Sequence, residues 1–386
     1  MGALFYSDPM PDLPPNILCP PKFAPVREAF AANFAGDFPE LGARFTAAIE
    51  GEIMLDLWGG HADRARTAPF DQHTLAPVFS TTKAAASLMM AWRVGRGGLR
   101  YDQRAADVWP QFGQAGKDRL TVEQVLSHQA GLSGLKGPLD PDIWFDWEAV
   151  VHELEIAEPL WPPGTASGYH PMTFGYLAGE LFRLTDGRTL GHALRQEIAG
   201  PLGLDLWIGL PESEDARVCQ VQRPPAMPDL GEITEPRRLA FLTPWSAVAS
   251  RDVRRWRAVE SPGANGHATA AALARMMAVL ACDGEIDGRE ILPPGVALEA
   301  AAQRIAGPDL VLPYTVSWGA GFLRNQGLGI YGPSEHAFGH SGWGGSCAVA
   351  DPERRLSFAY VMNRQSQHLI GDPRARRLID ALYSCL

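Results

Sequence analysis

The sequence predicts an α/β fold, built from both ends of the chain, with a mostly α-helical domain inserted in it. Strand-like segments lie near residues 44–58 and again after residue 317, and helical patterns fill the region between about 100 and 205. Pro- and Gly-rich loops separate those helices. Because segments at both chain ends share one type of structure, we expect residues 1–100 and 260–386 to form the α/β domain and residues 101–259 to form the insert.

The N-terminal part predicts one helix and a hairpin. After a proline-rich lead-in, residues 25–36 have helical spacing that ends at Gly36. Two strand patterns follow at 44–49 and 53–58, joined by the turn residues Glu50 and Gly51.

The middle of the chain predicts helices. Residues 80–95 are rich in Ala, Leu and Met without a breaker before Gly95, which is typical of a helix buried on most sides. The Thr121-x-x-Gln124 pattern of a capping box opens the segment 121–128. Further helices are expected at 146–156, 171–185 and 188–199, and a loop-like stretch at 206–265.

The C-terminal part predicts a helix, strands and a last helix. The helix runs from His267 until Gly284 stops it, and Pro373 fits the first turn of the last helix, at 372–383. The strands are expected at 317–323, 343–350 and 356–362, and the last two are separated by an Asp-Pro turn signal.

Composition excludes several classes of partner. The 386 residues carry a net charge of -10, which opposes binding of nucleic acid or an anionic membrane surface. No signal peptide and no long apolar run is visible, and five separated cysteines without a C-x-x-C pattern suit reduced thiols. We therefore expect a cytoplasmic protein with no metal and no cofactor, and the sequence does not determine its oligomeric state.

The candidate nucleophile is Ser80, in the segment F-S-T-T-K. A serine hydroxyl reacts poorly until a base removes its proton. At the start of a helix, Ser80 and Lys83 share one face, and burial in the apolar run that follows would lower the pKa of the lysine. A neutral Lys83 is then a general base.

Ser-x-x-Lys is a short pattern, and the chain contains it twice. In the second copy, Ser133 to Lys136, the glycines at 131, 134 and 137 make a helix improbable, so the geometry that couples serine to lysine is missing. The first copy is therefore the candidate site, and other segments of the chain are needed to tell a catalytic motif from a chance occurrence of the pattern.

Two later segments supply further candidate groups. Tyr169 lies where a loop meets a helix, as a second acid or base or as an ordinary packing residue. The Gly-rich run around His340, Ser341, Gly342 and Trp343 precedes a strand, where backbone amides can approach a ligand or simply form a bulge.

In their order, these segments resemble the serine β-lactamase and penicillin-binding-protein superfamily, whose motifs are Ser-x-x-Lys, Tyr-x-Asn and Lys-Thr-Gly. Here they read Ser80 to Lys83, Tyr169-His170-Pro171 and His340-Ser341-Gly342, and the stretches 120–132 and 162–165 resemble the class C branch. The resemblance runs from about residue 40 to the C-terminus. It implies a β-lactamase-like fold, an antiparallel sheet flanked by helices, with the active site between the two domains.

Two departures from the family motifs indicate the branch. Pro171 replaces the Asn that contacts the amide of an antibiotic, and the largely neutral His340 replaces the Lys that helps to hold a substrate carboxylate. These changes resemble the class C-related esterases called family VIII carboxylesterases. We therefore expect hydrolysis of short-chain acyl esters, with weak β-lactam hydrolysis as a side activity. No G-x-S-x-G motif offers a rival nucleophile.

The resemblance also implies roles for the site residues. Lys83 and Tyr169 would share the proton of Ser80, and the backbone amides of Ser80 and Trp343 would form the oxyanion hole. His340, Ser341, Gly342 and Trp343 would bind the ester substrate, with His340 orienting Tyr169.

Two alternatives stay open. One is an amide hydrolase, that is, a β-lactamase, a peptidase or an oligoamide hydrolase. The other is a non-catalytic binding protein that retains the fold.

Overall fold

The computed structural model describes residues 17–224, 226–248 and 253–386. The proline-rich lead-in lies largely outside these ranges. Within them, an eight-stranded sheet has the order β2-β1-β13-β12-β11-β10-β9-β8, and every neighbouring pair is antiparallel. Its strands are β1 (Gly42–Ile49), β2 (Glu52–Gly60), β8 (Ile305–Pro308), β9 (Thr315–Trp318), β10 (Leu323–Arg324), β11 (Phe338–Ser341), β12 (Cys347–Asp351) and β13 (Leu356–Met362).

The pairing of β1 with β13 joins the two ends of the chain, with Phe45 opposite Tyr360. This confirms the predicted antiparallel sheet built from both termini, and the hairpin of β1 and β2 has the predicted turn at Glu50 and Gly51. Small sheets are formed by β3 (Ala76–Phe79), β5 (Gly266–Ala268) and β4 (Leu206–Trp207), and by β6 (Glu285–Ile286) with β7 (Arg289–Glu290).

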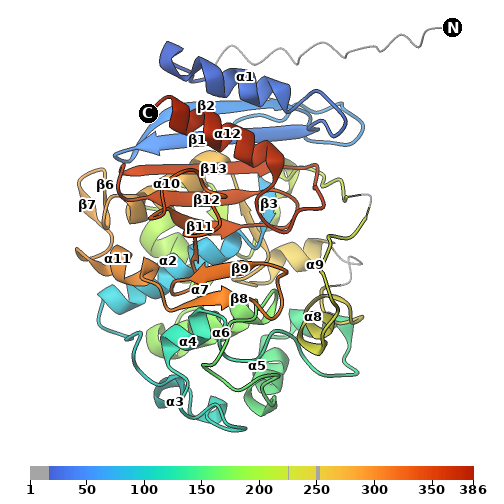
Figure 1. Cartoon of the computed structure of the whole chain (residues 1–386), viewed down its shortest axis with the longest axis vertical. Helices are drawn as coiled ribbons and strands as arrows, with labels where there is room; N and C mark the ends of the chain where they lie inside the picture. The colour runs from blue at the N-terminus through green and yellow to red at the C-terminus, as the bar shows by residue number, and fades with distance from the viewer. Residues whose placement is uncertain (1–16, 225, 249–252) are drawn as a thin grey trace, which may run out of the picture.

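Helices cover both faces of the large sheet and extend beyond it. They are α1 (Ala24–Ala32), α2 (Thr82–Gly95), α3 (Ala105–Val108), α4 (Val122–Leu126), α5 (Trp147–Ile156), α6 (Thr173–Asp186), α7 (Leu190–Leu194), α8 (Glu235–Phe241), α9 (Val253–Ala258), α10 (Ala270–Ala281), α11 (Val296–Ala301) and α12 (Pro373–Ser384). Figure 1 shows α1 and α12 side by side near β1 and β2, and α3 to α6 gathered at the opposite end of the molecule.

Successive side chains along the strands of the large sheet point alternately into two hydrophobic clusters, as the period of two along a strand requires. On β13, Ala359 and Val361 face the cluster that contains α2 and α10, whereas Phe358 and Tyr360 face the cluster that contains α1 and α12. The α2 cluster continues into α6 and α7, so buried side chains connect the sheet to the helix-rich region. The domain division at about residues 100 and 260 stays a prediction.

Several predicted elements differ from the structure. The loop-like stretch 206–265 contains α8 and α9, and α9 is stabilised by ion pairs of Arg254 and Arg257 with Asp215, which lies outside the helix. The predicted helix from His267 begins only at Ala270, because His267 belongs to β5 and Thr269 caps the helix. Neither feature is visible in local sequence periodicity.

Glycines interrupt two predicted strands. The segment 317–323 is split into β9 and β10, where Gly321 has a φ of 85°. The segment 343–350 begins as a turn, and Gly344 and Gly345 have φ values of 93° and 132°, which favour glycine. Among the described residues, no helix is long and apolar enough to cross a membrane.

Candidate active site

Ser80 lies in the turn that leads from β3 into α2. The residue before it, Phe79, has a φ of 48°, an unusual conformation for a bulky side chain and one that the surrounding structure must hold in place. Thr82 fixes this bend, because its hydroxyl donates to the Phe79 carbonyl and accepts the Gly266 N–H at 2.8 Å. Ser80 is therefore on a rigid support, just before the first turn of the helix.

Lys83 is completely buried, and its amine lies 3.2 Å from Ser80 Oγ. Nζ also donates to the carbonyl oxygens of Pro171, at 2.8 Å, and Gly263, at 2.7 Å. Burial lowers the pKa of Lys83 well below its ordinary value. A neutral amine has two N–H bonds and one lone pair, so with both hydrogens on carbonyls the lone pair is left for the Ser80 hydroxyl.

Tyr169, in the loop before α6, hydrogen-bonds the Ser80 side chain. Its ring lies 4.8 Å from Lys83 Nζ and stacks on Trp318 with an interplanar angle of 7°. Burial raises the pKa of Tyr169 above its ordinary value. Beside a neutral lysine, the tyrosine therefore keeps its proton and acts as a hydrogen-bond donor.

The buried carboxylate of Asp309 holds the Tyr169 loop. It accepts hydrogen bonds from the Tyr169 N–H at 2.9 Å and the Ser167 hydroxyl at 3.0 Å, and from the Trp318 indole at 3.4 Å. Two amides of its own loop, those of Val311 and Leu312, also donate to it. Asp309 could not be identified from the sequence, because a single Asp in a loop matches no motif.

His340 lies on β11, and not before a strand as the sequence suggested. Its Nδ1 donates to the Ser341 carbonyl at 2.8 Å, so Nε2 carries the lone pair. Burial lowers the pKa of His340 to about 3. The imidazole is neutral at pH 7 and meets Tyr169 through ring contact, with centroids 5.9 Å apart. Its orienting role stays a prediction.

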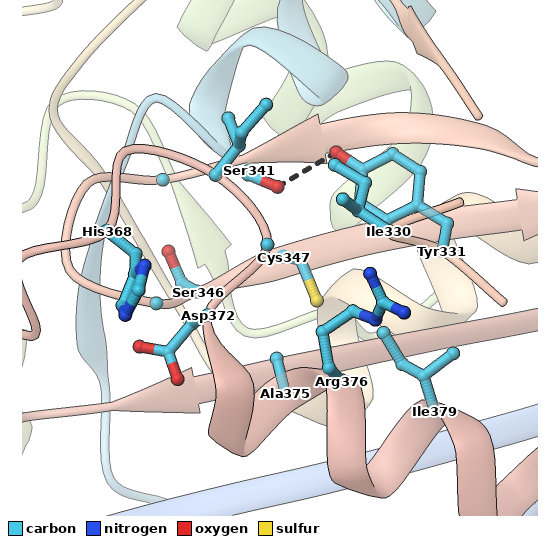
Figure 2. A pocket seen from close by; sticks show the side chains of 14 residues that line it. Ile330, Tyr331, Ser341, Ser346, Cys347, His368, Asp372, Ala375, Arg376 and Ile379 are labelled. Carbon is cyan, nitrogen blue, oxygen red and sulfur yellow. Dashed lines mark hydrogen bonds between the residues drawn. The ribbon is translucent and has the colours of Figure 1, made fainter. Parts of the chain in front are cut away.

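Ser341, the next residue on β11, contacts a second buried tyrosine, Tyr331. Its hydroxyl lies 2.9 Å from the Tyr331 hydroxyl, as the dashed line in Figure 2 shows. The surrounding cavity, between β11, β12 and α12, holds only about 10 Å³, roughly the space of one water. This cavity is too small to hold a substrate.

The turn after β11 places Trp343 near Ser80. A Cβ added to Gly342 would lie 2.2 Å from the Val78 carbonyl, so the close contact of this turn with β3 requires glycine. Ser346 secures the same contact, because its hydroxyl donates to the Val78 carbonyl at 3.0 Å. The backbone amides of Ser80 and Trp343 donate to no acceptor among the described residues. Both residues line one pocket.

That pocket has a volume of about 850 Å³ and is lined by Ser80, Tyr169, His340, Ser341 and Trp343 together with apolar side chains. The described part of the chain holds no group of three side chains that could bind a metal ion. The five named residues are thus brought together from the turn after β3, the loop before α6, the strand β11 and the turn that follows it.

The second Ser-x-x-Lys copy does not form such a site. Ser133 donates to the Pro236 carbonyl, and Lys136 is exposed and lies 3.9 Å from Glu158. Neither residue lines the 850 Å³ pocket.

Comparison with known proteins places this geometry among related chains. Residues 31–382 match the Beta-lactamase family. The chain is 35% identical to esterase/beta-lactamase LipL of Mycobacterium tuberculosis, over 91% of this chain and 83% of that protein. Among solved structures, it is 59% identical to a penicillin-binding protein homolog from Caulobacter crescentus (TM-score 0.94, 96% and 99% covered). It is 40% identical to a family VIII carboxylesterase (TM-score 0.90, 96% and 99% covered).

Proposed function

This chain belongs to the beta-lactamase family of serine hydrolases, and we propose that it is a carboxylesterase that forms an acyl-enzyme on Ser80. One observation carries the proposal. The Ser80 hydroxyl lies between the lone pair of a buried, neutral Lys83 and the hydroxyl of Tyr169, in a pocket of about 850 Å³. A base and a proton donor on one serine are what acyl transfer needs.

In acylation, Ser80 Oγ attacks the ester carbonyl carbon as its proton passes to Lys83 Nζ. The carbonyl oxygen becomes an oxyanion between the amides of Ser80 and Trp343, which have no other acceptor among the described residues. When the intermediate collapses, the C–O bond to the alcohol breaks. Tyr169 gives its proton to the departing oxygen and receives the one on Lys83.

Deacylation repeats these steps with water. As a water molecule attacks the acyl carbonyl, Tyr169 takes a proton from the water and passes its own proton to the lone pair of Lys83. The bond to Ser80 Oγ then breaks, the carboxylic acid leaves, and the proton on Lys83 returns to the serine oxygen. No redox partner or cofactor is required for this cycle.

Two features support esters over amides. The residue in the third position of the tyrosine motif, Pro171, presents a carbonyl that is already bonded to Lys83, so it offers no amide group to an antibiotic side chain. His340 is neutral and cannot act as the cation that holds a carboxylate in antibiotic recognition. The family VIII carboxylesterase at 40% identity points the same way. We propose short-chain acyl esters as substrates, with weak β-lactam hydrolysis as a side activity.

The test compares rates on p-nitrophenyl butyrate and on a chromogenic cephalosporin, for the wild type and Ser80→Ala. We expect a much higher kcat/KM on the ester and loss of both activities in the variant. A higher kcat/KM on the cephalosporin would favour the amide hydrolase. Absence of both activities, together with no labelling of Ser80 by a fluorophosphonate probe, would favour the non-catalytic alternative.

A further inference from the structure

The large pocket carries an unbalanced positive charge. Its described lining includes three arginines, Arg64, Arg223 and Arg257, and no aspartate or glutamate. This contrasts with the net charge of -10 on the whole chain. Lys83 is not part of the described lining, and burial lowers the pKa of the two lining histidines, His267 and His340, to about 4 and about 3, so both are neutral at pH 7. The arginines alone therefore set the charge of the described lining.

The three arginines differ in their partners. Arg257 lies 3.2 Å from Asp215, which balances its charge. Arg64 is held by the backbone, since its Nε donates to the Val221 carbonyl at 3.1 Å and Nη2 donates to the same oxygen. Within the described residues, no carboxylate pairs with Arg64 or Arg223. Two guanidinium groups thus keep donors free for a ligand.

Asp229 lies between two lining residues of the pocket, Pro228 and Leu230, but is not part of the described lining. Its carboxylate accepts the Gly231 N–H at 2.8 Å and pairs with neither arginine. Among the described residues, the guanidinium groups of Arg64 and Arg223 therefore have no carboxylate partner and can bind an anion.

The wall that carries these arginines is connected to the predicted oxyanion hole. The Gln222 N–H donates to the Asn363 carbonyl at 2.7 Å, and the Gln365 N–H donates back to Gln222 at 2.9 Å. The Gln365 side chain in turn donates to the Trp343 carbonyl at 3.1 Å. Arg64 and Arg223 line the same pocket as Ser80, so one molecule can place an ester at the serine and a second group at this wall.

The volume of the pocket leaves room for such a group. About 850 Å³ is near the upper end for pockets that bind drug-sized ligands, and more than a short acyl ester fills. Apolar side chains, including Phe241, Val248 and Trp256, form much of the remaining surface. A pocket with apolar walls and only positive charges in its lining concentrates anionic ligands.

We propose that the preferred substrates are esters that also carry a carboxylate, away from the scissile bond, and that Arg64 and Arg223 bind this carboxylate. The inference rests on the proposed esterase function and names its substrate class. It differs from carboxylate binding at the Lys-Thr-Gly position of the family, because His340 stands there and is neutral. The carboxylate would be recognised by a different wall, with charge-assisted hydrogen bonds to guanidinium groups.

The experiment uses matched ester pairs that differ in one charge. The acyl pair is 4-nitrophenyl hexanoate and the mono-4-nitrophenyl ester of adipic acid. The alcohol pair is methyl 4-(butanoyloxy)benzoate and 4-(butanoyloxy)benzoate. The anionic-to-neutral ratio of kcat/KM is compared between enzyme variants, so the intrinsic reactivity of each ester cancels. Turnover of the neutral esters and its loss in Ser80→Ala test the proposed function separately.

The variants are Arg64→Gln, Arg223→Gln and their combination. The control is Arg100→Gln, which removes the same charge from an exposed residue that pairs with Asp102 and does not line the pocket. We expect the wild type to prefer the anionic ester in at least one pair, by a ratio that added salt reduces. The double variant should lower this ratio about tenfold, and the control should leave it unchanged.

Three results would overturn the proposal. The first is a wild type that turns over neutral and anionic members equally, or favours the neutral one, in both pairs. The second is an anionic preference that the double variant retains. The third is an equal decrease in the control, which would assign the effect to net charge.

Discussion

Replacing Lys83 with Met tests whether the lysine is neutral in the folded protein. Burial lowers the pKa of Lys83 well below its ordinary value, so over a wide pH range the unfolded chain binds a proton here that the folded chain does not. The free energy of unfolding must then rise with pH, by about 1.36 kcal/mol per unit. If Lys83 is neutral, the free energy of unfolding of the wild type should rise by about 2.7 kcal/mol more than that of Lys83→Met between pH 7 and pH 9.

The assay is equilibrium urea unfolding of both proteins at the two pH values. Subtracting the variant removes the contributions of other titrating groups. Lys136→Met, at the exposed lysine of the second motif copy, serves as the control, and its difference from the wild type should not change with pH. A difference between wild type and Lys83→Met that stays constant from pH 7 to pH 9 would mean that Lys83 is charged, and would refute its role as the base.

The scarcity of lysine allows a direct check by NMR. The chain contains only four lysines, at positions 22, 83, 117 and 136. Labelling their Cε atoms with ¹³C should give four signals, of which Lys83→Met removes one. We expect that signal to have the chemical shift of a neutral amine at pH 7. The shift of a protonated amine would contradict the urea prediction.

Three further predictions concern two residues that support the site and the serine of the second motif copy. Asp309→Asn should lower kcat more than it changes KM and destabilise the fold by about 1–3 kcal/mol, because an amide nitrogen in place of Oδ2 cannot accept the Trp318 N–H and the Ser167 hydroxyl must turn to accept from it. Gly342→Ala should reduce kcat/KM at least about tenfold, since its Cβ would meet the Val78 carbonyl at 2.2 Å and displace the turn; near wild-type rates would show that the turn adapts. Ser133→Ala should leave ester hydrolysis unchanged, and a large loss in the same rate assay would mean that the wrong serine was chosen.

Much of the fold could be predicted because it follows local patterns. The capping box at Thr121 and the helices at α5, α6 and α12 come from short-range signals that the structure retains. The elements that were missed depend on distant partners. The helix α9 is stabilised by Asp215. The strand β11 pairs with β12, and a Cβ added to Gly339 would lie 2.0 Å from the Ala348 carbonyl, so this pairing requires glycine at that position.

The candidate site was predictable where it consists of motifs. Ser80, Lys83, Tyr169 and Trp343 all line or border one pocket, whereas local sequence gave no indication of Asp309. The partners of Lys83 were also hidden, because they are backbone carbonyls, which any residue type supplies. The apolar run after Ser80 predicted that burial would lower the pKa of Lys83, and the structure agrees. Burial is a tertiary property, so local sequence did not show that Tyr169 and His340 are buried as well.

The acyl-enzyme itself offers the most direct test of the central claim. Rapid quenching during turnover of p-nitrophenyl butyrate, followed by mass spectrometry of peptides, locates any covalent acyl group. We predict one butyryl group, attached to Ser80 and absent from Ser80→Ala. A butyryl group on another residue, or ester hydrolysis by Ser80→Ala at the wild-type rate, would contradict the account.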